Sequence, residues 1–101
     1  MHLVQILLPL SDNDGQPFPH ALFAAVRAEL ADRYGGITVY RRAPAEGLWC
    51  DDGQATRDDV AIYEVMVEAL DRNWWADYRA GLEVRFRQDE VVVRAVPVER
   101  L

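Results

Sequence analysis

The sequence contains no lysine: all eleven of its basic residues are arginine, against seventeen aspartates and glutamates. Its net charge at neutral pH is therefore −6. An acidic chain has no broad positive field with which to attract phosphate backbones or anionic lipid surfaces. We therefore expect neither nucleic acid nor a membrane as a partner.

Cysteine is almost absent as well. The single residue Cys50 allows no internal disulfide, which suits a reducing compartment. The apolar opening MHLVQILLPL lacks the basic leading region and the cleavage site of a secretion signal, and it is too short to span a bilayer. We expect a cytoplasmic protein.

Motifs for metals and cofactors are also missing. His2 and His20 stand alone, without the spacing that places two histidines on one helix face. The sequence has no phosphate-binding glycine loop, nucleophile elbow or hydride-cofactor fingerprint. We expect no metal and no cofactor.

What the sequence does contain is enough apolar material for one core. Half of the 101 residues are hydrophobic and 28% are charged, which is typical of a single globular domain. Apolar alternation and short apolar runs predict strands, and apolar stripes at helical spacing predict helices. The strands are expected at 3–10, 37–42, 60–67 and 91–98, and the helices at 19–34 and 71–86.

Local signals mark the ends of both helices. Pro19 suits the first turn of a helix, Gly35 a left-handed stop, and Asp71 an N-cap. The stripe of the second helix includes Trp74 and Trp75, which accounts for both as core residues and leaves a ligand-stacking role the less favoured interpretation.

The order strand, helix, strand, strand, helix, strand predicts one α+β domain over residues 1–101. Right-handed crossovers favour a ferredoxin-like βαββαβ arrangement, with a four-stranded antiparallel sheet in the order 4-1-3-2 and two helices on one face. The connection at 43–59 is long for a compact domain. Asp52-Gly53 predicts a hairpin turn within it.

The chain resembles a group of small bacterial proteins of unknown function. The stretches that carry the resemblance are LLPLSDNDGQPFP, GGITVYRRAPAEGLW, DGQATRDD and RFRQDEVVVRA, which together span most of the chain. In the order of its elements alone, the chain also resembles dimeric α+β barrel proteins, which include cofactor-free monooxygenases and small isomerases. The second resemblance implies a homodimer.

Strand alternation predicts a polar row on the sheet face that the helices leave uncovered. Successive side chains point to opposite faces. In the strand order above, the residues that interrupt the apolar strands fall on the uncovered face in one line. They are Arg94, Gln5, Glu64 and either Tyr40 or Arg42.

Apolar side chains flank this row on the same face. Such a surface is too large to leave in water, so we expect a second copy to cover it, sheet against sheet about a two-fold axis. A dimer that pairs edge strands is the alternative geometry. The interface candidates are Leu3, Leu7, Ile62, Met66, Val92 and Val96.

Three functional hypotheses remain open at this point. The first is a homodimeric binding or structural module, in which Glu64 pairs with Arg94 or Arg42. The second is a cofactor-free enzyme for a small organic acid, with Glu64 as general base and an arginine holding the anion. The third is a regulatory subunit that binds another protein through the open face. Trp49 in the long connection is expected to cap the dimer or to close over a pocket.

Overall fold

The computed structural model of the chain describes residues 1–41, 50–51, 54–55 and 60–101. The four long strands and both helices lie within two residues of the bounds expected from the sequence. The elements are β1 (His2–Pro9), α1 (His20–Tyr34), β2 (Thr38–Arg41), β3 (Cys50–Asp51), β4 (Gln54–Ala55), β5 (Val60–Val67), α2 (Arg72–Arg85) and β6 (Val92–Pro97).

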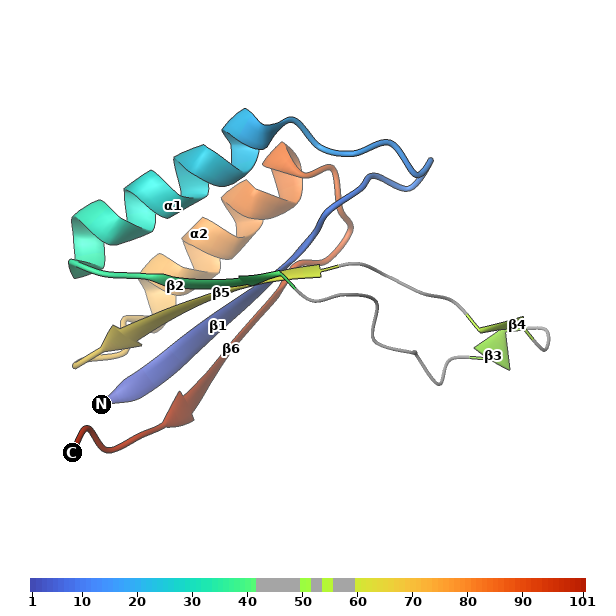
Figure 1. The fold of residues 1–101 in the computed structure, drawn as a ribbon. Helices are drawn as coiled ribbons and strands as arrows, with labels where there is room; N and C mark the ends of the chain where they lie inside the picture. Colours follow the sequence, from blue (N-terminus) through green and yellow to red (C-terminus); the bar gives the residue numbers. More distant parts are fainter. Residues whose placement is uncertain (42–49, 52–53, 56–59) are drawn as a thin grey trace.

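The main sheet has four strands in the order β2-β5-β1-β6, and every neighbouring pair is antiparallel. Counted along the four long strands, this is the predicted order 4-1-3-2. Helices α1 and α2 lie side by side over one face of this sheet (Figure 1). The short strands β3 and β4 pair with each other on either side of residues 52–53, as the hairpin prediction required. The protein is therefore an α+β domain.

The core lies between the helices and the sheet and follows the alternation of the strands. Val4, Ile6 and Leu8 of β1 are buried, while the residues between them are only partly covered. In β5 the buried set on the helix side includes Tyr63 and Val65. The helices contribute Phe23, Val26, Leu30, Trp75 and Leu82, and Phe86 follows α2.

The helix ends follow from local residues. Gly35 has φ of 77°, and its N–H donates to the carbonyl of Ala31, as expected for a glycine that ends a helix. The Asp71 carboxylate accepts a hydrogen bond from the backbone N–H of Trp74 at 3.1 Å. Pro19 lies at the N-cap, with ψ of 140°, instead of inside the first turn. The sequence-based start of α1 is therefore corrected by one residue.

Trp74 and Trp75 belong to an aromatic cluster between the helices. Trp75 is buried, and its ring stacks on Tyr34 with centroids 5.5 Å apart. The ring of Trp74 meets that of Trp75 edge-on at 4.8 Å, and the guanidinium of Arg33 lies 4.1 Å from the Trp74 ring centre. Trp74 thus packs against aromatic neighbours and a cation, which agrees with the packing interpretation.

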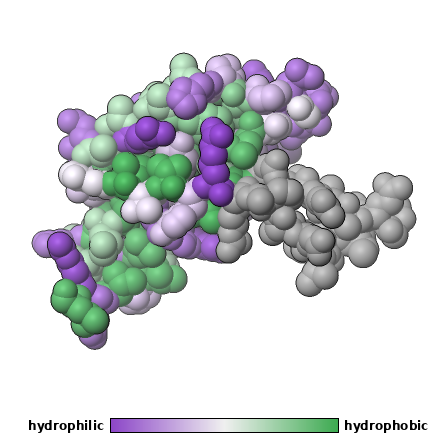
Figure 2. All heavy atoms as spheres, viewed as in Figure 1, coloured by the Kyte–Doolittle hydropathy of each residue, from purple (hydrophilic) through white to green (hydrophobic). Residues whose placement is uncertain are grey.

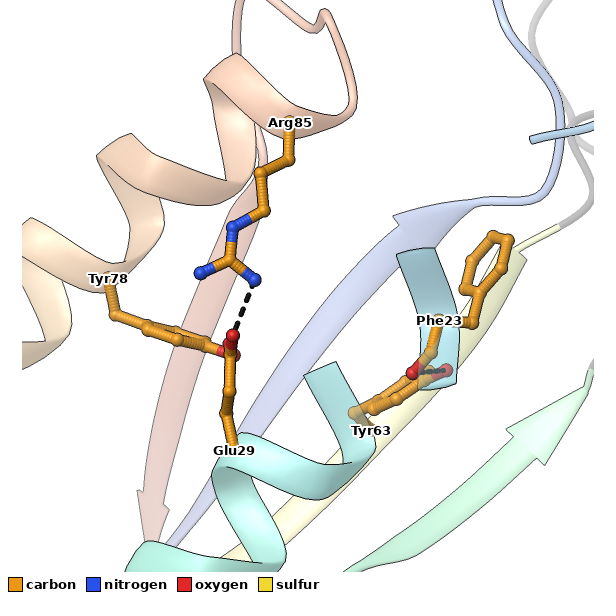
Figure 3. A network of polar contacts seen from close by, with 5 residues as sticks. All are labelled: Phe23, Glu29, Tyr63, Tyr78 and Arg85. Carbon is orange, nitrogen blue, oxygen red and sulfur yellow. Dashed lines mark hydrogen bonds and ion pairs between the residues drawn. The ribbon is translucent and has the colours of Figure 1, made fainter. Parts of the chain in front are cut away.

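A polar contact also joins the two helices (Figure 3). The hydroxyl of Tyr78 and the guanidinium of Arg85, both on α2, donate to the same carboxylate oxygen of Glu29 on α1, each at 2.8 Å. Burial raises the pKa of Tyr78 far above its usual value, and the bond to Glu29 adds to this. Partial burial pushes the pKa of Glu29 upward, but the hydrogen bonds from Arg85 and Tyr78 outweigh it and the pKa is lowered.

We expect Glu29→Gln to reduce the free energy of unfolding by about 1 kcal/mol at pH 7, because the side chains are roughly two-fifths exposed and solvent screens them. A carboxylate whose pKa is lowered on folding contributes stability above its unfolded value of 4.5 and loses it as pH falls through the folded value. Urea unfolding should therefore show the difference between wild type and variant at pH 7 and a smaller one near pH 3. A difference that grows on acidification would contradict this account.

Neither α1 nor α2, the helices of the described part of the chain, has the length and apolar content needed to cross a bilayer.

Candidate functional site

The observed strand register brings the polar row together on the sheet face opposite the helices. Gln5 of β1 lies directly across from Glu64 of β5 and, on its other side, from Arg94 of β6. Thr38 of β2 lies across from Glu64. Neighbouring strands are about 4.8 Å apart, so the backbones of Arg94 and Glu64 lie about 10 Å apart, with that of Gln5 halfway between them.

Gln5 connects the two charged groups. The guanidinium Nε of Arg94 donates to Gln5 Oε1 at 2.8 Å, and Gln5 Nε2 donates to a carboxylate oxygen of Glu64 at 2.5 Å. The donor at one end and the acceptor at the other fix which way the amide points. The sequence predicts that Glu64 pairs with Arg94 or Arg42; in the structure the amide of Gln5 lies between Glu64 and Arg94 and bonds to both.

Tyr40 completes the row at the Glu64 end. It lies across from Ile62 in the register, one step diagonal to Glu64. The negative charge of Glu64 raises the pKa of the Tyr40 hydroxyl, and a hydrogen bond to the carboxylate raises it further. Of the two residues proposed for this place, Tyr40 therefore accompanies Glu64, and Arg42 lies outside the described residues.

The row forms the floor of a shallow hollow of about 350 Å³. A second hollow, of about 690 Å³, shares Tyr40 and Glu64 and extends past Met66 towards the turn between α1 and β2 at Gly35. Tyr40 and Glu64 thus stand where the two hollows meet. The first hollow is lined by Gln5, Tyr40, Arg41, Ile62, Glu64 and Arg94.

Two residues at this site are not among those predicted from the sequence. Thr38 of β2 lies directly across from Glu64, and only the strand register shows this. Arg41 ends the edge strand β2 and lines both the hollow of the polar row and another hollow beside Phe18 and Phe23 on the helix side. A residue at the end of an edge strand can border both faces, and no pattern in the sequence indicates this.

The apolar residues beside the row are partly exposed, as expected for a face without helices. Met66, Val92 and Val96 expose 53%, 43% and 46% of their surface, and Leu3 and Leu7 are half-buried. Ile62 is the exception, with only 8% exposed. Ile62 lies on the predicted face, where it lines the hollow, but its cross-strand neighbours Leu7 and Tyr40 flank it on both sides and cover most of its surface. Figure 2 shows apolar surface, in green, where β1 and β6 lie in Figure 1.

The last two expectations concern Trp49 and metal ligands. Trp49, proposed as a cap or a closing residue, lies outside the described residues. Within the described ranges, no three histidine, cysteine, aspartate or glutamate side chains gather in a group that could hold a metal ion.

The chemistry of the row is that of a binding site with separated charges. Glu64 offers a carboxylate that already accepts from a neutral amide, and Arg94 offers a guanidinium with donors besides the Nε used by Gln5. A ligand with a cationic part would be attracted to the Glu64 end, and an anionic part to Arg94. The exposed apolar side chains beside the row would contact the uncharged body of such a ligand.

Comparison with known proteins supports the fold. A phage SAM lyase, solved in complex with S-methyl-5'-thioadenosine, is similar in structure with a TM-score of 0.55; the match covers 94% of this chain and 79% of that chain at 15% sequence identity. No protein-family model matches the sequence, and no curated protein does. The resemblance to the small bacterial proteins stays a prediction. At this identity the structural likeness shows that the two proteins share an α+β fold.

Proposed function

We propose that this protein is a homodimeric, ferredoxin-like module that binds a small molecule with separated charges on the outer face of its sheet. The observation that supports this most directly is the ordered row of Arg94, Gln5 and Glu64 at the floor of an open hollow. Charged groups that only stabilise a sheet need no hollow above them, whereas a binding site needs charged groups and a hollow to hold the ligand.

The ligand class follows from the row. Glu64 with Tyr40 attracts a cation or a hydrogen-bond donor, and Arg94 attracts a carboxylate or another oxyanion. An apolar or aromatic body would lie against Met66 in the larger hollow. A modified amino acid with an aromatic substituent carries all three features.

The fold neighbour suggests two probes that differ in these features. S-Adenosylmethionine carries a sulfonium, an ammonium and a carboxylate on an adenosine body. S-Methyl-5'-thioadenosine, which the phage SAM lyase binds, keeps the adenosine and the sulfur but has none of those charges. If the charged row recognises the ligand, the first probe binds more tightly than the second.

We expect S-adenosylmethionine to bind at least about tenfold more tightly than S-methyl-5'-thioadenosine, the equivalent of about 1.4 kcal/mol and within the range of one charge-assisted hydrogen bond. Glu64→Gln and Arg94→Gln should each weaken S-adenosylmethionine binding by about tenfold and change binding of the neutral probe by less than about threefold. Isothermal titration calorimetry measures all of these affinities.

Matched control variants lie on the helix side. Asp32→Asn and Arg27→Gln remove the same charges from exposed positions of α1, away from the hollow, and should leave both affinities unchanged. The proposal would be refuted if neither probe bound, or if the controls weakened binding as much as the two variants of the row. Mass spectrometry of the same mixtures, in which an enzyme would leave S-adenosylmethionine altered and a binding module would leave it intact, separates the two classes.

A purely structural dimer is the second candidate, favoured by the exposure of Met66, Val92 and Val96. Burying three such side chains against a second copy is favourable by about 1 kcal/mol or more for each. In that case the row would only align the two copies. Equal, undetectable binding of both probes by a protein that sediments as a dimer would favour this candidate.

A further inference from the structure

We infer that the binding site is composite: Glu64 and Tyr40 come from one copy of the chain, and the arginine that faces them is Arg94 of the partner copy. This inference rests on the function proposed above. It follows from the pattern of charged and apolar side chains on the outer sheet face, which is complementary to itself when a second copy is turned about an axis along β1.

The charges of the row are arranged antisymmetrically about β1. Arg94 lies on one side of Gln5 and Glu64 on the other, each one strand away. Two such faces can be brought together about a two-fold axis that lies between them, either along the strands or across them. These two axes place different residues opposite each other.

An axis across the strands sets Arg94 against Arg94 and Glu64 against Glu64, which is unfavourable for like charges that lose water. An axis along β1, above Gln5, exchanges the two sides of the row. It sets Arg94 of each copy against Glu64 of the other, so both ends of the row meet an opposite charge. Charge complementarity therefore selects the axis along β1.

The apolar residues fit the same axis. One apolar row lies on each side of the polar row. The strand register makes neighbours of Val92, Leu7 and Ile62 in the first row, and of Val96, Leu3 and Met66 in the second. Rotation about the axis along β1 places each apolar row opposite the same row of the second copy. Val96 then faces Met66 and Leu3 faces Leu3, so the most exposed apolar side chains of the face are covered together.

Sheet packing also brings the partner's arginine within reach of Glu64. Packed sheets lie about 10 Å apart, so long side chains from both faces meet midway. The partner's Arg94, above Glu64, can therefore contact the carboxylate of S-adenosylmethionine when its sulfonium lies at Glu64, because the two groups are joined by four single bonds and span at most about 6 Å. In the same chain, the Nε of Arg94 already donates to Gln5.

Mixing the two variants with weakened binding tests the composite site. Glu64→Gln and Arg94→Gln proteins are each titrated with S-adenosylmethionine, then mixed in equal amounts, dissociated in mild denaturant, refolded together and titrated again. A mixed dimer contains one intact site, made of Glu64 from the Arg94→Gln chain and Arg94 from the Glu64→Gln chain. With random exchange, about a quarter of all sites should regain wild-type affinity.

The result that overturns the inference is equally clear. If each site lies within one chain, every chain in the mixture carries a lesion, and mixing restores no high-affinity binding. Wild-type protein refolded in the same way shows whether the procedure itself is harmless. Native mass spectrometry of the mixture, with one variant labelled with ¹⁵N, shows whether mixed dimers have formed.

Charge reversal tests the same geometry without any ligand. Arg94→Glu and Glu64→Arg should each weaken dimerisation by at least about tenfold in sedimentation velocity, because each places like charges opposite one another. The double variant Glu64→Arg with Arg94→Glu should restore it. A wild-type monomer, or single reversals that leave dimerisation unchanged, would overturn the composite site. If the single reversals weakened dimerisation and the double variant restored it, but neither probe bound, the proposed function would be refuted and the dimer geometry would stand.

Discussion

Replacing Phe86 with alanine will lower the free energy of unfolding by about 3–5 kcal/mol, which is the range for removing a buried aromatic ring. Phe86 is fully buried at the end of α2. Its ring lies 5.2 Å from that of Phe18, before α1, and 5.3 Å from that of Phe23, within α1. One side chain therefore joins α2 to two segments from the first third of the chain.

The loss would be a large share of the stability of a domain of this size, which typically totals about 5–15 kcal/mol. Each 1 kcal/mol corresponds to about 4–8 °C in melting temperature, so the midpoint should fall by at least about 12 °C. Urea and thermal unfolding followed by circular dichroism measure both quantities. Because the alanine side chain is helix-compatible, the effect reports packing and not loss of helix propensity.

Val84→Ala is the matched control on the same helix. Val84 exposes 78% of its surface, so its removal should change the free energy of unfolding by less than about 0.5 kcal/mol. If Phe86→Ala cost no more than this control, the three phenylalanines would not form the link between α2 and the start of α1 that their ring contacts indicate.

The sequence predicted the fold well because the spacing of apolar residues and the residues at helix ends determine local structure. Alternation in β1 and β5 separates the buried Val4 and Tyr63 from the outer Gln5 and Glu64, and each of these assignments is confirmed. Gly35 and Asp71 mark helix ends through backbone geometry and a single hydrogen bond. The sheet order followed because right-handed crossovers leave few arrangements of these elements.

The site was predicted in part, because its details depend on contacts between distant strands. Alternation placed Gln5, Glu64 and Arg94 on one face, but only the register shows that the amide of Gln5 lies between the two charges. The burial of Ile62 and the presence of Arg41 in the lining of the hollow depend on packing between side chains of neighbouring strands. A pattern along one strand carries no information about its neighbours' side chains.

Replacing Trp75 with alanine is expected to be about as costly as replacing Phe86, again about 3–5 kcal/mol. Trp75 is 5% exposed, stacks on Tyr34 of α1 and meets Trp74 and Tyr78 of its own helix edge-on. Its removal opens a cavity at the centre of this cluster. It also withdraws the packing that holds Tyr78 beside Glu29.

Trp75→Phe distinguishes the contribution of the aromatic ring to stability from that of the indole N–H. The indole Nε1 is buried, and among the described residues it has no hydrogen-bond partner. Substitution by phenylalanine therefore gives up no hydrogen bond in this part of the structure and removes a donor that is costly to bury. We expect it to cost only about 1–2 kcal/mol, for the smaller ring, as measured by urea unfolding.

The same pair of variants decides between packing and ligand stacking for this tryptophan. Trp75 lies on the helix side of the sheet, whereas the polar row faces the other way, so Trp75→Phe should bind S-adenosylmethionine with wild-type affinity. If Trp75→Phe were as unstable as Trp75→Ala, the indole nitrogen would have a partner that matters to folding. If it were stable yet lost the ligand, the binding site would belong on the helix side, and the role given to Glu64 and Arg94 would be wrong.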